Sequence, residues 1–174
     1  MSEINFGKTV SLAEAEDLIV NVPQNRFMLR GEPGIGKSSM LERIGKRTGL
    51  PVAYIDVPNM DLGDIAMPVV DHETKTTKYY PSARFMLERG EPVAIMLDEF
   101  SKGPGPVKNM LHPLIEVVNP RLGDVPVPPG SLIFLTGNLS SDGVGDNMPA
   151  HTRARLTCVT VRKPSAESWI EWAV

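Results

Sequence analysis

Apolar residues follow two patterns along the chain, continuous runs and helical spacing, and each pattern predicts a different kind of element. The unbroken apolar run at residues 92–97 predicts a central strand buried on both faces, because a half-exposed strand alternates instead, and the mostly apolar run at 131–136 predicts another buried strand. Apolar residues three and four positions apart predict amphipathic helices. The alternation of these elements predicts an α/β domain with a parallel sheet. The other expected elements are strands at residues 26–29, 52–57 and 156–161 and helices at 11–20 (with Ser11 and Glu14 as a capping box), 39–47, 83–89, 107–118 (with Pro113 as a kink or boundary) and 149–155.

Two insertions interrupt this alternation and have the composition of β-hairpins. Residues 68–70 and 76–80 flank a polar turn, and residues 119–130 contain a second turn with three prolines after it. Tyr79 and Tyr80 of the first hairpin are assigned to the core. The other segments expected outside the sheet are a helical turn at residues 59–67 with Asp61 as its cap, an exposed and mobile loop at 140–147, and a helix that begins at 165.

Residues 31–38 (GEPGIGKS) satisfy the phosphate-loop pattern G-x-x-x-x-G-K-[ST] and lie between a predicted strand and a predicted helix. In such a loop successive backbone N–H groups point at one centre, and the following helix adds its positive dipole end. Lys37 is expected to reach the β- and γ-phosphates, and the Ser38 hydroxyl to bind Mg²⁺. The pattern therefore predicts a nucleotide site. The residues expected to contact the nucleotide are Gly31, Glu32, Pro33, Gly34, Ile35, Gly36, Lys37, Ser38 and Ser39.

Polar residues follow each of the two long apolar runs. Asp98 and Glu99 follow the first run and Asn138 follows the second. Ligands of parallel α/β sheets bind at the carboxyl ends of the strands, so Asp98 is expected beside Ser38. Nucleotide hydrolysis needs one carboxylate near Mg²⁺ and another to deprotonate the attacking water, and two adjacent acids supply both. Asn138 would hold that water or touch the γ-phosphate, with Thr136 as a weaker candidate and an Asx turn as the structural alternative.

Arg153 and Arg155 stand just before the last predicted strand. Catalysis of phosphoryl transfer is mostly charge stabilisation, and an arginine donated across a subunit interface supplies it well. A solvated pair of arginines explains the spacing equally well.

Composition limits the class of protein further. The 174 residues suffice for one domain, and the net charge of −3 gives no general attraction to nucleic acid or to anionic membranes. Cys158 lies in an apolar alternation and is expected to be buried and reduced, while His72, His112 and His151 have no metal-ligand spacing. The N-terminus has no secretion-signal pattern and no apolar run approaches the roughly 20 residues of a membrane span, so a cytoplasmic protein is expected.

Together these segments resemble the Walker A, Walker B, sensor 1 and arginine-finger segments of AAA+ ATPases. The two predicted hairpins resemble the helix-2 insert and the pre-sensor-1 hairpin of the MoxR-like branch. The resemblance implies a three-layer sandwich around a five-stranded parallel sheet. The matching segments, in the order that the family shows, are GEPGIGKS (31–38), IMLDEF (95–100), LTGN (135–138) and MPAHTRARL (148–156).

The same resemblance implies ATP and Mg²⁺ as cofactors and a ring, a hexamer, that remodels a partner protein, either a client or an adaptor. Arg155 matches the finger of the branch, although Leu156 stands where Phe is usual, and Arg153 is the second candidate. The roles that carry over to the other residues are phosphate and Mg²⁺ binding (Lys37 and Ser38), Mg²⁺ support (Asp98), water activation (Glu99) and γ-phosphate sensing (Asn138).

The resemblance also has departures. AAA+ proteins usually continue into a helical lid, so we expect residues 1–164 to form the nucleotide-binding core and residues 165–174 to begin the helix of a missing or truncated lid. A nucleotide-gated binding module with little hydrolysis of its own is therefore the alternative function. A nucleic-acid motor is disfavoured by the acidic balance, and a GTPase by the lack of an Asn-Lys-x-Asp segment. The family's aromatic-Gly pore loop is absent, with Met60 and Met67 as the nearest candidates.

Overall fold

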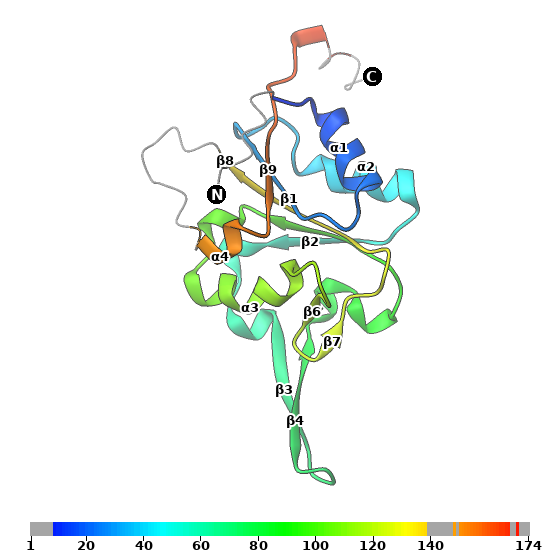
Figure 1. Ribbon diagram of the computed structural model, residues 1–174, viewed down its shortest axis with the longest axis vertical. Helices are drawn as coiled ribbons and strands as arrows, with labels where there is room; N and C mark the ends of the chain where they lie inside the picture. The colour runs from blue at the N-terminus through cyan, green and yellow to red at the C-terminus, as the bar shows by residue number, and fades with distance from the viewer. Residues whose placement is uncertain (1–8, 139–147, 149, 168–169, 171–174) are drawn as a thin grey trace.

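A five-stranded parallel sheet forms the centre of the computed structural model, which describes residues 9–138, 148, 150–167 and 170 (Figure 1). The strand order is β2-β5-β8-β1-β9, so the strand before the phosphate loop is separated from β5 by one strand, β8. The predicted five-stranded parallel sheet is confirmed. Its strands are β1 (Phe27–Gly31), β2 (Val52–Asp56), β5 (Ala94–Asp98), β8 (Leu132–Asn138) and β9 (Thr157–Thr160).

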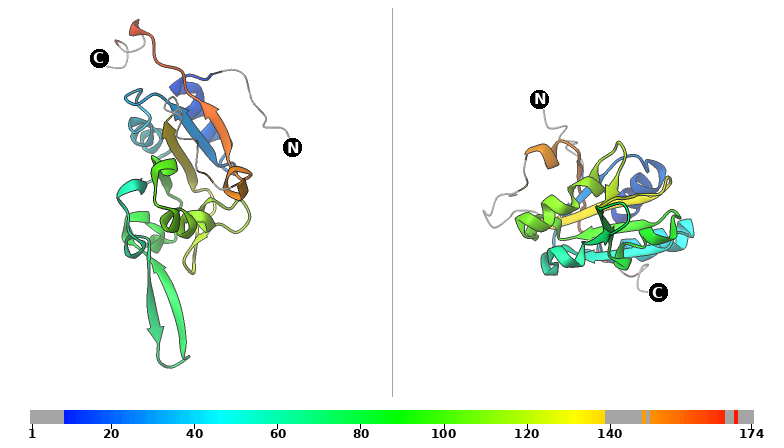
Figure 2. Two further views of the ribbon diagram at one scale, coloured as in Figure 1. Left: turned by 90° about the vertical axis from the view of Figure 1, so that its left-hand side faces the viewer. Right: turned by 90° about the horizontal axis from the view of Figure 1, so that it is seen from below.

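Helices cover both faces of this sheet and give the three layers (Figures 1 and 2). Side chains of β5 alternate between two buried clusters: Ala94 and Met96 belong to the cluster shared with α1 and α2, and Ile95 and Leu97 to the cluster shared with α3. Both long apolar runs are therefore buried on both faces, as predicted. The helices are α1 (Leu12–Asn21), α2 (Ser39–Thr48), α3 (Gly105–Ile115) and α4 (Ala150–Arg153). Among the described residues, no helix is long and apolar enough to cross a membrane.

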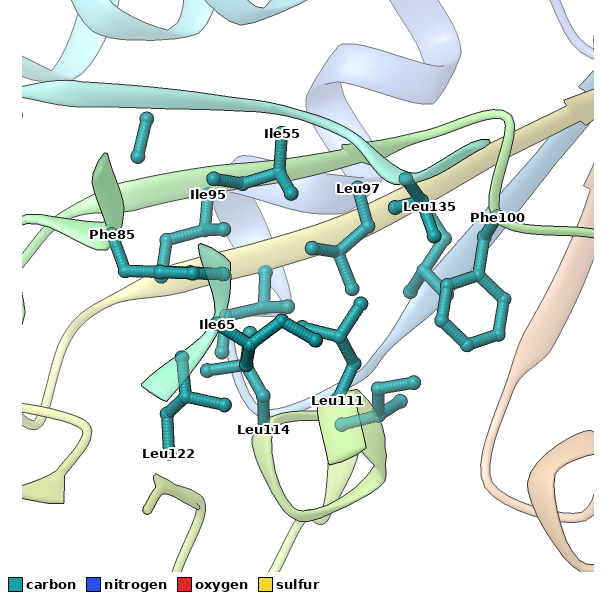
Figure 3. Close-up of a cluster of buried hydrophobic side chains, with 14 of the residues drawn as sticks. Ile55, Ile65, Phe85, Ile95, Leu97, Phe100, Leu111, Leu114, Leu122 and Leu135 are labelled. Atoms are coloured by element: carbon teal, nitrogen blue, oxygen red, sulfur yellow. The ribbon is translucent and has the colours of Figure 1, made fainter. Parts of the chain in front are cut away.

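The cluster that α3 covers includes Leu97 and Phe100, which flank the predicted acids in the chain (Figure 3). Ile95 and Leu97 lie close to Leu111 and Leu114 of α3 in this cluster, and all four side chains are fully buried or nearly so. Phe100 joins the same cluster, is 0% exposed and follows Glu99 directly in the chain. Close packing on either side of Asp98 and Glu99 therefore restricts their backbone.

Helix α3 is displaced toward the N-terminus relative to the predicted helix at residues 107–118. It begins at Gly105 with Pro106 in its first turn, where the missing N–H of proline costs no hydrogen bond. It ends two residues after Pro113, because Glu116 is extended (φ −56°, ψ 142°). Val118, which was expected on the apolar face, is consequently 77% exposed.

The helix predicted at residues 83–89 is wrong. The segment forms two short 3₁₀ turns, η3 (Ala83–Phe85) and η4 (Leu87–Arg89), on either side of Met86 with φ 56°. Phe85 and Leu87 are both buried although only one residue separates them, which the single face of an α-helix does not allow. The left-handed backbone at Met86 turns the chain so that both side chains enter the core.

Both predicted hairpins are present, as β3 (Ala66–Asp71) with β4 (Thr76–Pro81) and as β6 (Arg121–Leu122) with β7 (Val125–Pro126). The β3–β4 hairpin extends away from the body of the domain (Figures 1 and 2). The core assignment of Tyr79 and Tyr80 is therefore wrong, since their exposed fractions are 45% and 47%. At the base of the hairpin, the Tyr79 N–H donates to the Asp124 carboxylate (2.7 Å) and the Asp124 N–H donates to the Tyr79 carbonyl (2.9 Å).

Several smaller expectations are met in part. The turn expected at residues 59–67 is shorter: η1 (Val57–Asn59) and η2 (Leu62–Asp64), with Asp61 as the cap of the second. Cys158 is half-buried rather than fully buried. The loop expected at residues 140–147 lies outside the described residues, as does most of the helix expected from 165.

The capping box at the start of α1 is confirmed. The Ser11 hydroxyl accepts from the Glu14 N–H (3.2 Å), and the Glu14 carboxylate accepts from the Ser11 N–H (2.7 Å). Ser11→Ala is expected to lower the free energy of unfolding by about 1 kcal/mol, because one helix N–H loses its acceptor. Urea denaturation measures this change, with the exposed Thr9→Ala, expected within about 0.5 kcal/mol of wild type, as the control. Equal stability of the two variants would show that the box contributes nothing.

Candidate functional site

The phosphate-loop pattern forms the turn from β1 into α2 at the carboxyl edge of the sheet. Gly34 (φ 79°) and Gly36 (φ 92°) adopt left-handed backbone conformations, which explains the need for glycine at both positions. Ile35 between them is buried, and the Ser39 hydroxyl donates to the Gly36 carbonyl (2.8 Å). These contacts hold the loop onto the start of α2.

Lys37 lies folded back over its own loop. Its Nζ donates to the carbonyls of Gly31 (2.6 Å) and Glu32 (2.9 Å) and lies 3.5 Å from Oδ1 of Asn138. The side chain is only 8% exposed, and this burial lowers the pKa of Lys37, while the nearby carboxylates of Asp98 and Glu99 act in the opposite direction. A buried ammonium group therefore stands among oxygen acceptors, in the position from which it can reach a phosphate bound to the loop.

Asp98 ends β5 and faces the start of α2. The Ser38 Oγ lies 3.5 Å from Asp98 Oδ2, so the structure brings together the two residues that were predicted as a Mg²⁺ site. Two more hydroxyls hold the carboxylate: Thr136 of β8 donates to Oδ1, and Tyr54 of β2 donates to Oδ2 (2.7 Å). Thr136 is fully buried, and its hydroxyl proton is already donated to Asp98, which argues against the water-holding role considered for Thr136.

Glu99 follows in a left-handed backbone conformation (φ 49°), and its N–H donates to the Thr136 hydroxyl (3.0 Å). Its Oε1 accepts from Lys102 Nζ (2.7 Å), at the end of the 3₁₀ turn η5 (Phe100–Lys102), and from Asn138 Nδ2 (3.4 Å). Asn138, the last residue of β8, therefore connects the candidate base to Lys37. The predicted Asn138 is at the site.

Tyr54 and Lys102 contact the site although sequence analysis did not single them out. Lys102 has a local signal, since it stands three residues after Glu99 and the two are joined as an (i, i+3) ion pair. Tyr54 has no local signal, because its contact with Asp98 depends on the pairing of β2 with β5, which places Tyr54 opposite Met96.

The two candidate finger arginines lie at the opposite edge of the sheet. Thr157, the first residue of β9, pairs with Phe27, the first residue of β1, and α4 precedes it (Figure 1). Arg153 and Arg155 therefore lie near the amino ends of the strands, whereas the phosphate loop lies at their carboxyl ends. The length of β1, about 13 Å at 3.3 Å per residue, separates the two positions. Within one chain, neither arginine is brought to the site.

Arg155 is held instead by neighbours at its own edge. Its Nε lies 2.9 Å from Glu116 Oε1, and one guanidinium N–H donates to the His151 carbonyl (2.7 Å). Arg155 lowers the pKa of Glu116, whereas burial, followed by the charge of Arg155, lowers the pKa of His112. The rings of His112 and His151, far apart in sequence, are 5.1 Å apart. Arg153 is exposed and donates to the Met148 carbonyl (3.2 Å).

The family model described as AAA domain (dynein-related subfamily) matches residues 26–156, three quarters of the sequence. The chain belongs to this family. The AAA match includes the phosphate loop, Asp98, Glu99, Asn138 and both arginines. The predicted AAA+ membership is therefore confirmed, while the MoxR-like branch stays a prediction.

A solved structure agrees on the fold of this AAA domain. It is the crystal structure described as a "putative ATPase" from Cytophaga hutchinsonii ATCC 33406, with a TM-score of 0.64 and 19% sequence identity over 95% of this chain. At this identity the likeness concerns the fold alone. The chain spans about half of that structure, since the match covers 51% of its length.

Proposed function

We propose that this AAA domain binds ATP with Mg²⁺ and hydrolyses it. The observation that carries the proposal is the convergence of Lys37, Ser38, Asp98, Glu99 and Asn138 at one edge of the sheet, although they come from three separate segments. Parallel α/β sheets bind ligands at this edge. The exposed loop residues 32–34 leave the phosphate-binding backbone accessible to a ligand.

The residues present fit a magnesium ion. Mg²⁺ prefers oxygen ligands, and the Ser38 hydroxyl and the Asp98 carboxylate face one another at 3.5 Å. Bound there, the ion would neutralise charge on the phosphates. Ser38 and Asp98 are the residues that would hold it.

The remaining residues divide the hydrolytic work among them. Lys37 would exchange its loop carbonyls for phosphate oxygens. Glu99 would take a proton from the attacking water, and Asn138, in contact with both Lys37 and Glu99, would sense the γ-phosphate. Lys102 forms an ion pair with Glu99 and so engages this candidate base. That pair favours the second candidate function, a nucleotide-gated assembly module with slow hydrolysis of its own.

We further propose a ring of six subunits, in the manner of the MoxR-like branch, in which Arg155 or Arg153 completes the site of a neighbour. The support is topological: both arginines lie at the edge of the sheet opposite their own phosphate loop. An arginine that stabilises transition-state charge must touch the phosphates, so these two can act only on another subunit. Remodelling of a client or adaptor protein, in the cytoplasm, completes this proposal.

Phosphate release from ATP with Mg²⁺, measured as specific activity against protein concentration, tests the proposal. For a ring ATPase, activity rises steeply with concentration and is lost in Lys37→Met, whereas Lys46→Met on the exposed side of α2 behaves as wild type. ATP binding without hydrolysis at any concentration would favour the assembly module. Absence of both ATP binding and hydrolysis in the wild type would overturn the proposal.

A further inference from the structure

The Asp98 carboxylate is held from both sides of its strand. β5 lies between β2 and β8 in the sheet. Tyr54 of β2 donates to Oδ2 at 2.7 Å, and Thr136 of β8 donates to Oδ1. Each oxygen of the carboxylate therefore has its own hydroxyl donor, and the two donors come from different neighbouring strands. Such paired contacts fix the rotation of a carboxylate about its Cβ–Cγ bond.

We propose that Tyr54 and Thr136 are positioning residues that orient Asp98 toward Ser38 for binding of a divalent cation. The proposal rests on the proposed function. Oδ2, the oxygen that Tyr54 contacts, is also the oxygen 3.5 Å from the Ser38 hydroxyl. With both hydroxyls in place, the carboxylate presents this oxygen to the phosphate loop before any cation binds.

Thr136 has a second function in this arrangement. Its hydroxyl oxygen accepts the Glu99 N–H (3.0 Å) while its proton goes to Asp98. Glu99 has a positive φ of 49°, a conformation that costs energy for a residue with a side chain. One buried hydroxyl therefore fixes the cation ligand and the backbone of the candidate base together, and no other acceptor is needed for that N–H.

The contact that Tyr54 makes at this site is with Asp98. About half of the Tyr54 side chain is exposed, at 51%, but its hydroxyl end is the part that reaches the carboxylate. Partial burial of Tyr54, and then its hydrogen bond to Asp98, raise the pKa of this phenol. Loss of this hydroxyl is expected to weaken cation binding and to leave the backbone of Glu99 unchanged.

Electron paramagnetic resonance of Mn²⁺, titrated into the full chain with saturating ADP, measures cation affinity without any turnover. Tyr54→Phe and Thr136→Val are each expected to raise the Mn²⁺ dissociation constant about 10-fold or more, the usual effect of losing a contact that orients a metal ligand. Thr136→Ser, which keeps the hydroxyl, is expected to restore wild-type affinity. Tyr80→Phe on the exposed hairpin is the matched control and is expected to bind as wild type.

The rate of ATP hydrolysis distinguishes the role of the Tyr54 hydroxyl from that of the Thr136 hydroxyl. At saturating Mg²⁺, Tyr54→Phe is expected to regain wild-type kcat, whereas Thr136→Val is not, because the latter also loses its hold on Glu99. If Tyr54→Phe binds Mn²⁺ like wild type and shows an unchanged Mg²⁺ requirement, the inference is overturned, even where Thr136→Val fails to fold. A wild-type chain that binds neither Mn²⁺ with ADP nor ATP would instead overturn the proposed function itself.

Discussion

Glu99→Gln is expected to lower kcat for ATP hydrolysis by about 10²–10⁴-fold and to leave ATP binding intact, because the amide cannot accept a proton from water. The substitution is almost isosteric, and the amide oxygen can still accept from Lys102 and Asn138, as Oε1 does in the structure. The loss therefore reports on the chemistry rather than on the position of the side chain. Single-turnover phosphate release gives the rate, and a fluorescent ATP analogue gives the affinity.

The matched control for this variant is Glu91→Gln. Glu91 is an exposed acid just before the amino end of β5, the strand whose other end leads to Glu99. The control removes the same charge at the wrong edge of the sheet and is expected to hydrolyse ATP as wild type does. Turnover in Glu99→Gln equal to that of Glu91→Gln would exclude Glu99 as the general base.

Arg155→Ala is expected to lower hydrolysis by about 10³–10⁵-fold when the residue is a finger supplied to a neighbouring subunit. Mixing this variant with Glu99→Gln gives a sharper result than either alone. In a random equal mixture, about one quarter of the interfaces join an intact Glu99 to an intact Arg155, so two inactive proteins recover activity on mixing. No recovery at any ratio, with both variants still assembling, would contradict a shared site.

Two further variants distinguish the effect of the Arg155 guanidinium from the effects of Arg153 and of the ion pair with Glu116. Arg153→Ala tests the second candidate, which is exposed and lies in the same α4 region. Glu116→Gln removes the charge that pairs with Arg155 at 2.9 Å but keeps the arginine itself. Near-wild-type hydrolysis in Glu116→Gln together with loss in Arg155→Ala would assign the effect to the guanidinium and not to the broken ion pair, which is partly exposed and contributes about 1 kcal/mol or less.

The parts of the site that follow from local sequence were predictable. The phosphate loop is readable in part because Gly36, a fixed position of the pattern, adopts a positive φ, as the neighbouring Gly34 does. The meeting of Ser38 with Asp98 follows from a general rule, since all strand ends of a parallel sheet share one edge. Tyr54 escaped assignment, and Thr136 was considered only as a weaker candidate for holding water, because their contacts with Asp98 depend on strand order and register, which only the folded sheet determines.

The wrong predictions of the fold also arose because tertiary structure, which the sequence pattern does not specify, decides which residues are buried. Tyr79 and Tyr80 are adjacent aromatic residues in a β-strand, and aromatic residues are typical of buried strands, but their hairpin stands away from the body of the domain, where no layer covers it. At residues 83–89 a cap at Ser82 and a stop at Gly90 suited a helix, yet a single left-handed residue, Met86, was enough to bury Phe85 and Leu87 another way. Periodicity records which residues are apolar, but it does not record which surface is available to bury them.

The placement of α4 at the edge opposite the phosphate loop has a consequence for symmetry. A subunit that receives an arginine at one edge and donates one at the other cannot satisfy both needs in a two-fold dimer, where each partner presents the same surface. If Arg155 or Arg153 acts on a neighbouring subunit as proposed, association runs head to tail, and only closure into a ring leaves no site and no arginine unused. An open chain of any length would retain one site without its arginine and one arginine without a site.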